Sequence, residues 1–156
     1  MDLEFMAVAL LEARRCAPIP TAYCVGACVT INGALVAQGH SREIEGNTHA
    51  EECCLAKLEA MAQESNQMSC RLASKTIYTT LEPCGLRLSG KLSCAQRIID
   101  YGGFTRCVIG GAEPDLFVEK CVGARLLELA GIVVEWISDV EIRNQCLNAA
   151  IMKADF

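Results

Sequence analysis

Three residues that lie far apart in the chain, His49, Cys84 and Cys94, place the strongest constraint on its fold. His49 opens the run His49-Ala50-Glu51, Cys84 follows a proline, and Cys94 comes later still. Zinc is held in proteins by imidazole nitrogens and thiolates in tetrahedral geometry, and a catalytic site leaves the fourth position open. We therefore expect a fold that brings these three side chains together around one Zn2+ ion.

Glu51 lies two residues after His49, close enough to act beside the metal without binding it. Zinc lowers the pKa of a bound water to about 7, and a nearby carboxylate can take up and return the proton. Glu51 also completes a capping box with Thr48, in which it would only satisfy the backbone N–H of that residue. We interpret Glu51 as catalytic, because the histidine and the Pro83-Cys84 pair accompany it.

Two other cysteines offer alternative ligand sets. Cys53 lies four residues after His49 and would share its helix face, although it also fits the apolar stripe of that helix. A purely structural zinc site is closed by four protein ligands, and Cys53 or Cys54 could supply the missing thiol. Such a chain would be a non-catalytic zinc-stabilised binding domain, and Glu51 would have no role at its metal.

The histidine, glutamate and cysteines together resemble the zinc deaminase pattern H-x-E followed by P-C-x-x-C. The first half matches, whereas a loop of nine residues, 85–93, separates the two cysteines where the pattern has two residues. This loop, with the runs 46–54, 80–84 and 87–90, is similar to the fungal riboflavin-biosynthesis deaminases of the cytidine deaminase-like superfamily. The similarity extends to Val25-Gly26, Glu113-Pro114 and Phe117.

The resemblance implies a zinc-dependent enzyme that hydrolytically deaminates 2,5-diamino-6-ribitylamino-4(3H)-pyrimidinone 5'-phosphate in riboflavin biosynthesis. Its small-molecule partner would be this pyrimidine ribityl phosphate, and Glu51 would move protons during ammonia release. A cytidine or deoxycytidylate deaminase is the nearest alternative, because it would share every metal residue. The long loop between Cys84 and Cys94 favours the riboflavin branch, since cytidine deaminases have their cysteines close together.

Substrate contacts are implied by the same resemblance. Asn47, just before the expected helix, would fix the pyrimidine ring through its amide, although a turn or cap residue is an equally ordinary role. The phosphate needs cationic donors, which the 85–93 loop offers beside a hydroxyl, and solvated surface charge explains these residues almost as well. The further candidates are Arg87, Ser89 and Lys91 in the loop, and Tyr23, His40 and Arg42 outside it.

Strand-like and helix-like apolar patterns alternate along the chain, which predicts an α/β protein. Asn32-Gly33 is the strongest hairpin signal, and a helix between two late strands favours their running parallel. We expect a single domain, residues 1–156, folded as a three-layer α/β/α sandwich with a mixed sheet of about five strands, as in the cytidine deaminase-like fold. The expected helices are 3–15, 48–62, 92–101, 124–130 and 140–153, and the expected strands are 23–31, 34–38, 77–80, 107–109 and 132–134.

Composition and charge narrow the partners. A net charge of -5 without a cluster of basic residues argues against a nucleic-acid partner. Residues 1–4 are acidic where an export signal is basic, and the apolar run 5–11 is only about half a membrane span. We therefore expect a cytoplasmic protein with no membrane partner, whose 11 cysteines are mostly reduced core residues.

Oligomeric state depends on the last expected helix. The resemblance implies pairing through helical faces, and the apolar residues Ile142, Leu147 and Ile151 permit a homodimer. One amphipathic helix can equally pack on its own core, so both possibilities stay open at this point.

Overall fold

Five strands form one mixed sheet within the residues that this computed structural model describes, 1–65, 72–113 and 122–152. The strand order is β2-β1-β3-β4-β5; β1 runs antiparallel to β2 and β3, whereas β3, β4 and β5 run parallel to one another. The mixed sheet and the parallel late strands are therefore confirmed. The strands are β1 (Gly26–Ile31), β2 (Ala34–His40), β3 (Lys75–Leu81), β4 (Phe104–Gly111) and β5 (Val133–Trp136).

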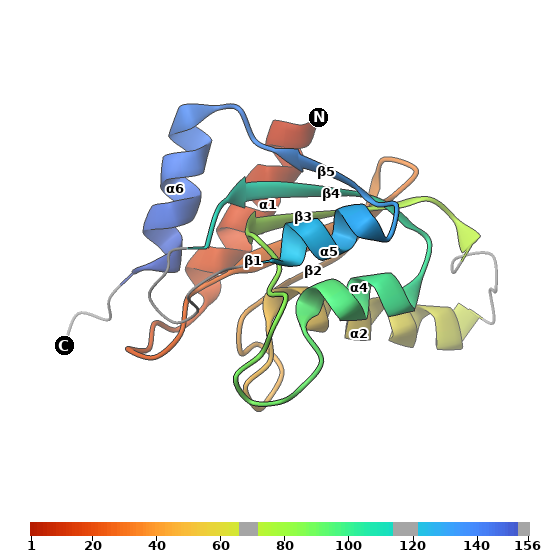
Figure 1. The fold of residues 1–156 in the computed structure, drawn as a ribbon, viewed down its shortest axis with the longest axis horizontal. Helices are drawn as coiled ribbons and strands as arrows, with labels where there is room; N and C mark the ends of the chain where they lie inside the picture. The colour runs from red at the N-terminus through yellow and green to blue at the C-terminus, as the bar shows by residue number, and fades with distance from the viewer. Residues whose placement is uncertain (66–71, 114–121, 153–156) are drawn as a thin grey trace.

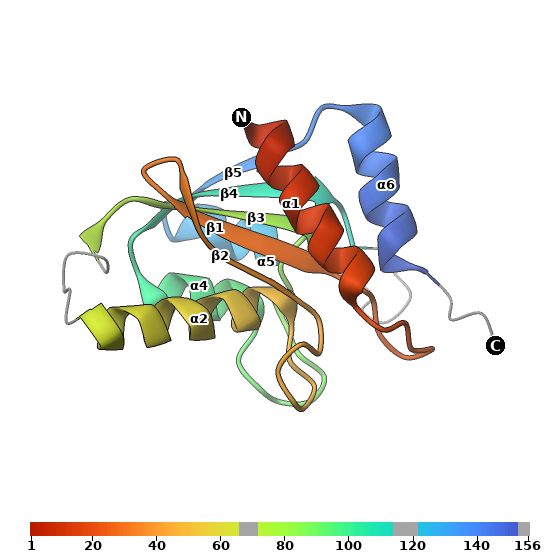
Figure 2. The ribbon, with the colours of Figure 1, turned by 180° about the vertical axis from the view of Figure 1, so that it is seen from behind.

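Helices cover both faces of the sheet and complete three layers. Two helices, α1 and α6, lie on one face, and α2, α4 and α5 lie on the other (Figures 1 and 2). A separate buried apolar cluster joins each helical layer to the sheet. The predicted α/β/α sandwich is confirmed, with helices α1 (Asp2–Arg15), α2 (Ala50–Ser65), α4 (Cys94–Tyr101), α5 (Gly123–Leu129) and α6 (Val140–Ala150).

The predicted elements are all present, and the differences lie at their ends. Asn32 and Gly33 take φ values of 50° and 78°, which is the left-handed backbone that a two-residue hairpin turn requires. The expected start of the first strand at residue 23 is wrong, because Cys24 N–H donates to Ala150 at the end of α6 and pairing begins at Gly26. The apolar character of the residues just before Gly26 reflects their burial and not strand pairing. Pro114, Phe117 and Lys153 lie outside the described residues.

No helix in the described residues has both the length and the apolar character needed to cross a bilayer. The longest, α2, has 16 residues and carries several charged side chains.

Arg106 on β4 ties the beginning of α1 to the sheet. Its Nη2 and Nη1 donate to the Asp2 carboxylate at 2.6 and 2.8 Å, and the Tyr78 hydroxyl donates to the same group at 2.9 Å. The hydrogen bond from Arg106, partly opposed by burial, lowers the pKa of Asp2 from 3.8 to about 2. A carboxylate whose pKa is lower in the folded state stabilises the fold above its unfolded pKa and loses that contribution as the pH falls through the folded value.

We expect the substitution Asp2→Asn to lower the free energy of unfolding by about 1 kcal/mol at neutral pH, a value discounted for the exposure of both partners. The difference from wild type should shrink below about pH 4 and vanish only below about pH 2. Urea unfolding across this pH range measures it. Glu4→Gln, at an exposed position of the same helix turn, is the matched control. An equal effect of both changes would show that the contact of Asp2 with Arg106 does not stabilise the fold.

Candidate active site

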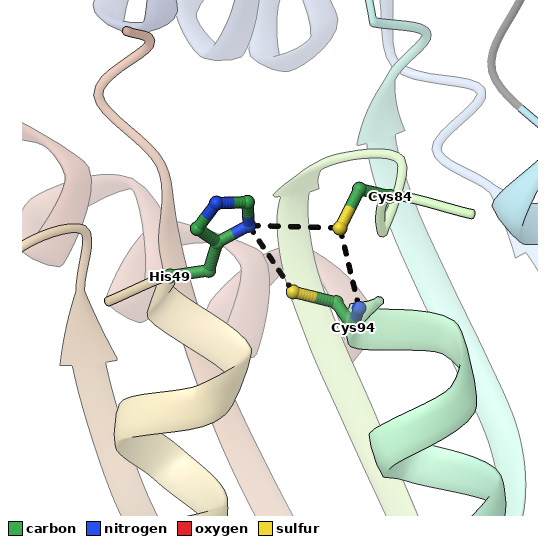
Figure 3. Close-up of side chains that lie close together, drawn as sticks. All are labelled: His49, Cys84 and Cys94. Carbon is green, nitrogen blue, oxygen red and sulfur yellow. Dashed lines mark hydrogen bonds between the residues drawn. The ribbon is translucent and has the colours of Figure 1, made fainter. Parts of the chain in front are cut away.

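Three chain segments meet at one edge of the sheet and bring His49, Cys84 and Cys94 together. His49 directly precedes α2, Cys84 follows the end of β3, and Cys94 is the first residue of α4. One donor atom of each residue lies within 4.8 Å of the other two. The Nδ1 atom of His49 lies 3.6 Å from the Cys84 sulfur and 3.3 Å from the Cys94 sulfur (Figure 3).

This donor set fits a zinc ion in both chemistry and spacing. Zn–N bonds of about 2.0–2.1 Å and Zn–S bonds of about 2.3 Å that meet at a tetrahedral angle hold nitrogen and sulfur about 3.6 Å apart. The two nitrogen-to-sulfur distances, 3.6 and 3.3 Å, are close to that value. Cys94 is fully buried, whereas His49 and Cys84 are only half-buried and can face a small molecule.

The N-terminus of α4 favours the thiolate form of Cys84. Hydrogen bonds from the Cys94 side chain, from His49 and from the Cys94 N–H lower the pKa of the Cys84 thiol to about 4, although burial acts in the opposite direction. Ser93 caps this helix by accepting from the Gln96 N–H at 3.2 Å, which fixes its first turn. The thiolate that a zinc site requires is therefore stabilised by the protein.

The start of α5 holds the turn that carries Cys84. The Glu82 carboxylate accepts a hydrogen bond from the Ala124 N–H at 3.0 Å. Gly123 packs so closely that a Cβ atom there would lie 1.6 Å from the Pro83 carbonyl oxygen. Only glycine fits this approach, so α5 helps to hold Cys84 in place.

Glu51 lies in the first turn of α2 and is 3% exposed. Its Oε1 is 2.9 Å from the Thr79 hydroxyl, and that hydroxyl is also 2.9 Å from the Leu81 carbonyl oxygen. A hydroxyl carries one proton and can accept others, so Thr79 can donate to ionised Glu51. It can equally accept from protonated Glu51 while it donates to Leu81. The surroundings of Glu51 thus accommodate both of its protonation states.

Burial raises the pKa of Glu51, and the positive charge of His49 opposes that rise. The carboxylate points to Thr79 on β3, and among the described residues it makes no hydrogen bond to the Thr48 N–H, so the carboxylate half of the alternative capping box is absent. The Thr48 hydroxyl donates instead to the Ile44 carbonyl oxygen at 2.7 Å. The geometry gives Glu51 a position beside His49 and Cys84 that helix capping does not explain.

The alternative cysteine ligands lie elsewhere. Cys53 donates to the Thr48 hydroxyl at 3.5 Å, and Cys54 donates to the Ala27 carbonyl oxygen at 3.4 Å. Among the described residues, neither belongs to the group formed by His49 and its two cysteine partners. The four-ligand structural zinc site is therefore not supported.

The residues His49, Cys84 and Cys94 are called the metal group from here on. A cavity of about 530 Å³ opens beside it, and His49, Glu51 and Cys84 line this cavity. Its volume lies within the range of small-molecule sites. Five of the predicted substrate contacts also line it: Tyr23, Arg42, Asn47, Arg87 and Ser89.

Two predicted contacts lie away from the cavity lining. His40 places its Nδ1 atom 3.1 Å from the Ser41 carbonyl oxygen and its Nε2 atom 3.8 Å from the Glu43 carboxylate. Lys91 is exposed on the loop between the cysteines. The fold thus brings together most of the predicted residues but separates these two from the cavity.

Arg87 is buried, with a side chain only 2% exposed. Its Nη1 donates to the Glu52 carboxylate at 2.6 Å, and its Nη2 donates to the Asn47 carbonyl oxygen at 2.5 Å. Burial of Glu52 would raise its pKa, but Arg87 outweighs burial and lowers it. Arg87 therefore connects the loop between the cysteines to the residues that flank the start of α2.

We expect Arg87→Gln to lower the free energy of unfolding by about 2 kcal/mol, because Glu52 would lose a nearly buried partner. Arg97 is the matched control, since it lies 3.8 Å from the same carboxylate but is more exposed. Arg97→Gln should cost less than about 1 kcal/mol. Urea unfolding of both variants measures the difference. Equal losses of unfolding free energy would show that the Arg87–Glu52 pair contributes no more to stability than the exposed pair.

Thr79 and Glu82 are site residues that the sequence analysis did not identify. Thr79 lies between Ile77 and Leu81 on one face of β3, where a hydroxyl among apolar neighbours was an available signal. It is completely buried. Glu82 carried no comparable signal, because its partner on α5 is adjacent only in the folded chain.

A mixed sheet covered by helices brings one imidazole, two thiols and a buried carboxylate together beside the starts of two helices. This arrangement defines a zinc-binding deaminase domain. The chain belongs to the cytidine and deoxycytidylate deaminase zinc-binding region family, whose model matches residues 1–111. It is 43% identical over 148 residues to the diaminohydroxyphosphoribosylamino-pyrimidine deaminase of Schizosaccharomyces pombe. The match covers 95% of this chain and 34% of the relative, so the chain spans about a third of that protein's length.

Solved structures of the Aspergillus oryzae Rib2 deaminase, in a C-terminal deletion mutant, have the same fold. One at pH 4.6 gives a TM-score of 0.79 at 31% identity, with 96% of this chain and 90% of that chain covered. Another, in complex with DARIPP at pH 6.5, gives a TM-score of 0.77 at 29% identity and the same coverage.

Proposed function

We propose that this chain catalyses the zinc-dependent hydrolytic deamination of 2,5-diamino-6-ribitylamino-4(3H)-pyrimidinone 5'-phosphate in riboflavin biosynthesis. The convergence of His49, Cys84 and Cys94 beside the buried Glu51, at a cavity of about 530 Å³, carries the proposal. The name of the Schizosaccharomyces pombe relative and the DARIPP complex of the Aspergillus oryzae deaminase support the substrate class.

In this proposal His49, Cys84 and Cys94 hold one zinc ion. When bound, zinc supplies the Lewis acidity that makes water a nucleophile near neutral pH. The Cys94 N–H, which lies 3.2 Å from the Cys84 sulfur, favours the thiolate that such a ligand needs. The half-buried imidazole faces the cavity, so the substrate can reach this centre.

Glu51 is the proton carrier of the proposed reaction. It takes the proton of the attacking water, delivers it to a ring nitrogen and then assists the departure of the amino group as ammonia. Each step changes its protonation state. Thr79 suits this role because its hydroxyl can donate to the carboxylate or accept from the acid without moving away.

The substrate contacts that we propose are those that line the cavity: Tyr23, Asn47, Arg87 and Ser89. Asn47 would orient the ring, and Arg87 holds the backbone carbonyl of that residue. Arg42 adds a second guanidinium to the lining, which suits an anionic substrate. The roles of His40 and Lys91 stay predictions.

Ammonia release from the ribityl phosphate compound, measured beside cytidine and dCMP, tests the substrate. We expect kcat/KM for the ribityl compound to exceed kcat/KM for cytidine and for dCMP by at least about 100-fold. Preferred turnover of cytidine or dCMP would favour the cytidine or deoxycytidylate deaminase alternative. A zinc-loaded protein that turns over none of the three would favour the non-catalytic binding domain.

We further propose a cytoplasmic homodimer, for which the exposed apolar residue at the end of α6 offers a contact. Ile142 and Leu147, two of the apolar residues expected at a dimer contact, pack partly against the chain's own core. Ile151, the third, is 52% exposed. Light scattering of the zinc-loaded protein measures the oligomeric state, and a monomer at micromolar concentration would contradict the dimer.

A further inference from the structure

Two buried thiols that the proposed reaction does not use, Cys16 and Cys24, lie against each other beside the cavity. Cys16 follows the end of α1, and Cys24 lies shortly before β1. The chain reverses between them, and Ile19 and Ala22 form an isolated antiparallel bridge. The Cys24 thiol donates to the Cys16 carbonyl oxygen at 3.6 Å, and both sulfurs lie within hydrogen-bond distance of the same Arg42 Nη2 atom.

Arg42 brings a positive charge to both sulfurs. Its Nη2 atom lies 2.9 Å from the Cys16 sulfur and 3.7 Å from the Cys24 sulfur, and its Nη1 donates to the Tyr23 carbonyl oxygen at 3.2 Å. The φ angle of Arg42 is 60°, a left-handed conformation that is uncommon outside glycine. A guanidinium in this position stabilises a thiolate, so the pair differs from ordinary core cysteines.

We propose that Cys16 and Cys24 form a reversible disulfide, a thiol-modification site separate from the metal group. A disulfide requires two side chains whose backbones already lie close, and the turn at residues 19–22 supplies that approach. The intervening segment contributes Ile19, Thr21 and Ala22 to the cavity lining, so a small oxidant can come near the pair.

Hydrogen peroxide is the oxidant that this chemistry requires. The reaction can begin at Cys24, whose sulfur lies 3.7 Å from the Arg42 Nη2 atom and whose pKa is lowered by the neighbouring Cys16 and Arg42 against the effect of burial. Its thiolate attacks the terminal peroxide oxygen, the O–O bond breaks, and the leaving hydroxide takes up a proton to become water. The sulfur is then a sulfenic acid.

The Cys16 sulfur completes the disulfide. It attacks the Cys24 sulfenic sulfur, the S–S bond forms, the S–O bond breaks, and the departing hydroxide leaves as water with the Cys16 proton. Two thiols have then given two electrons to one peroxide, with two waters as products. An external thiol reverses the step by thiol–disulfide exchange.

The neighbouring cysteines are less suited to this reaction. Cys28 donates to the Phe5 carbonyl oxygen, and burial raises its pKa to about 12. Burial likewise raises the pKa of Cys54 and of Cys107. Cys84 and Cys94 are the ligands of the proposed zinc site, which protects them while the metal is bound.

Stepwise addition of hydrogen peroxide to the zinc-loaded protein tests the proposal. After each dose, remaining thiols are blocked, and the protein is digested with trypsin and chymotrypsin without reduction for mass spectrometry. Cleavage after Arg15 and Tyr23 separates Cys16 from Cys24, so only a disulfide holds residues 16–23 to the following peptide. We expect this link to form before zinc is released and to disappear after dithiothreitol.

Cys28 lies in the same peptide as Cys24, so Cys28→Ser is the matched control and should keep the link. Cys16→Ser and Cys24→Ser should each remove it. Oxidation of Cys84 or Cys94 with zinc loss while Cys16 stays reduced would overturn the proposal. A link that persists in Cys24→Ser would also overturn the proposal. Where a variant does not fold, the peptide map of the wild-type protein alone decides whether Cys16 and Cys24 are linked.

Discussion

Replacing Glu51 with glutamine is expected to lower kcat by at least about 1,000-fold while the protein keeps its zinc and its fold. Glutamine has nearly the same shape and can still meet the Thr79 hydroxyl at 2.9 Å, but it cannot take up or deliver a proton. Steady-state ammonia release, with zinc content determined in the same samples, measures the effect. Substrate affinity should change little, because the loss concerns the chemical steps.

Glu64→Gln, at an exposed position near the other end of α2, is the matched control and should leave kcat unchanged. If Glu51→Gln retained more than about a tenth of wild-type kcat, general acid–base catalysis by this residue would be refuted. Zinc loss in the same variant would instead assign Glu51 a role in holding the metal.

Removal of one thiol ligand should have the second large effect. We expect Cys84→Ser to weaken zinc binding by more than about 100-fold and to abolish turnover at ordinary zinc concentrations. A ligand that binds only the folded state stabilises it by mass action. A chelator should therefore lower the melting temperature of wild type and leave that of Cys84→Ser unchanged.

Cys53→Ser is the matched control for this experiment, because Cys53 is a buried cysteine of α2 that bonds to Thr48 instead of joining the metal group. It should retain zinc, turnover and the response to chelator. A Cys84→Ser protein that binds zinc as tightly as wild type would remove Cys84 from the ligand set. Zinc loss in Cys53→Ser would support the alternative in which Cys53 is a zinc ligand.

The grouping of His49, Cys84 and Cys94 could be predicted from sequence because the zinc chemistry proposed for them needs few residue types. His49 and the two distant thiols, with a proline before Cys84, leave little choice of ligands once Glu51 is placed beside them. The sheet was predictable for a similar reason, since short strand-like apolar runs alternate along the chain with longer helix-like segments. Both inferences depend on local patterns and on ligand chemistry.

The substrate side could not be predicted in the same way. Arg87 in a polar loop suggests a solvent-facing cation, yet Glu52 on α2 accepts its hydrogen bond inside the protein. His40 lies at the end of β2, where its ring meets Ser41 and not the cavity. These outcomes depend on the path of two loops, and no periodicity encodes that path.

The most direct test of the central claim is incubation of the zinc-loaded chain with the diaminopyrimidine ribityl phosphate in 18O-labelled water. We expect release of one ammonia per product, with one solvent oxygen at the ring carbon that lost its amino group, and no reaction after zinc removal. A product without solvent oxygen, or equal turnover by the zinc-free chain, would contradict that claim.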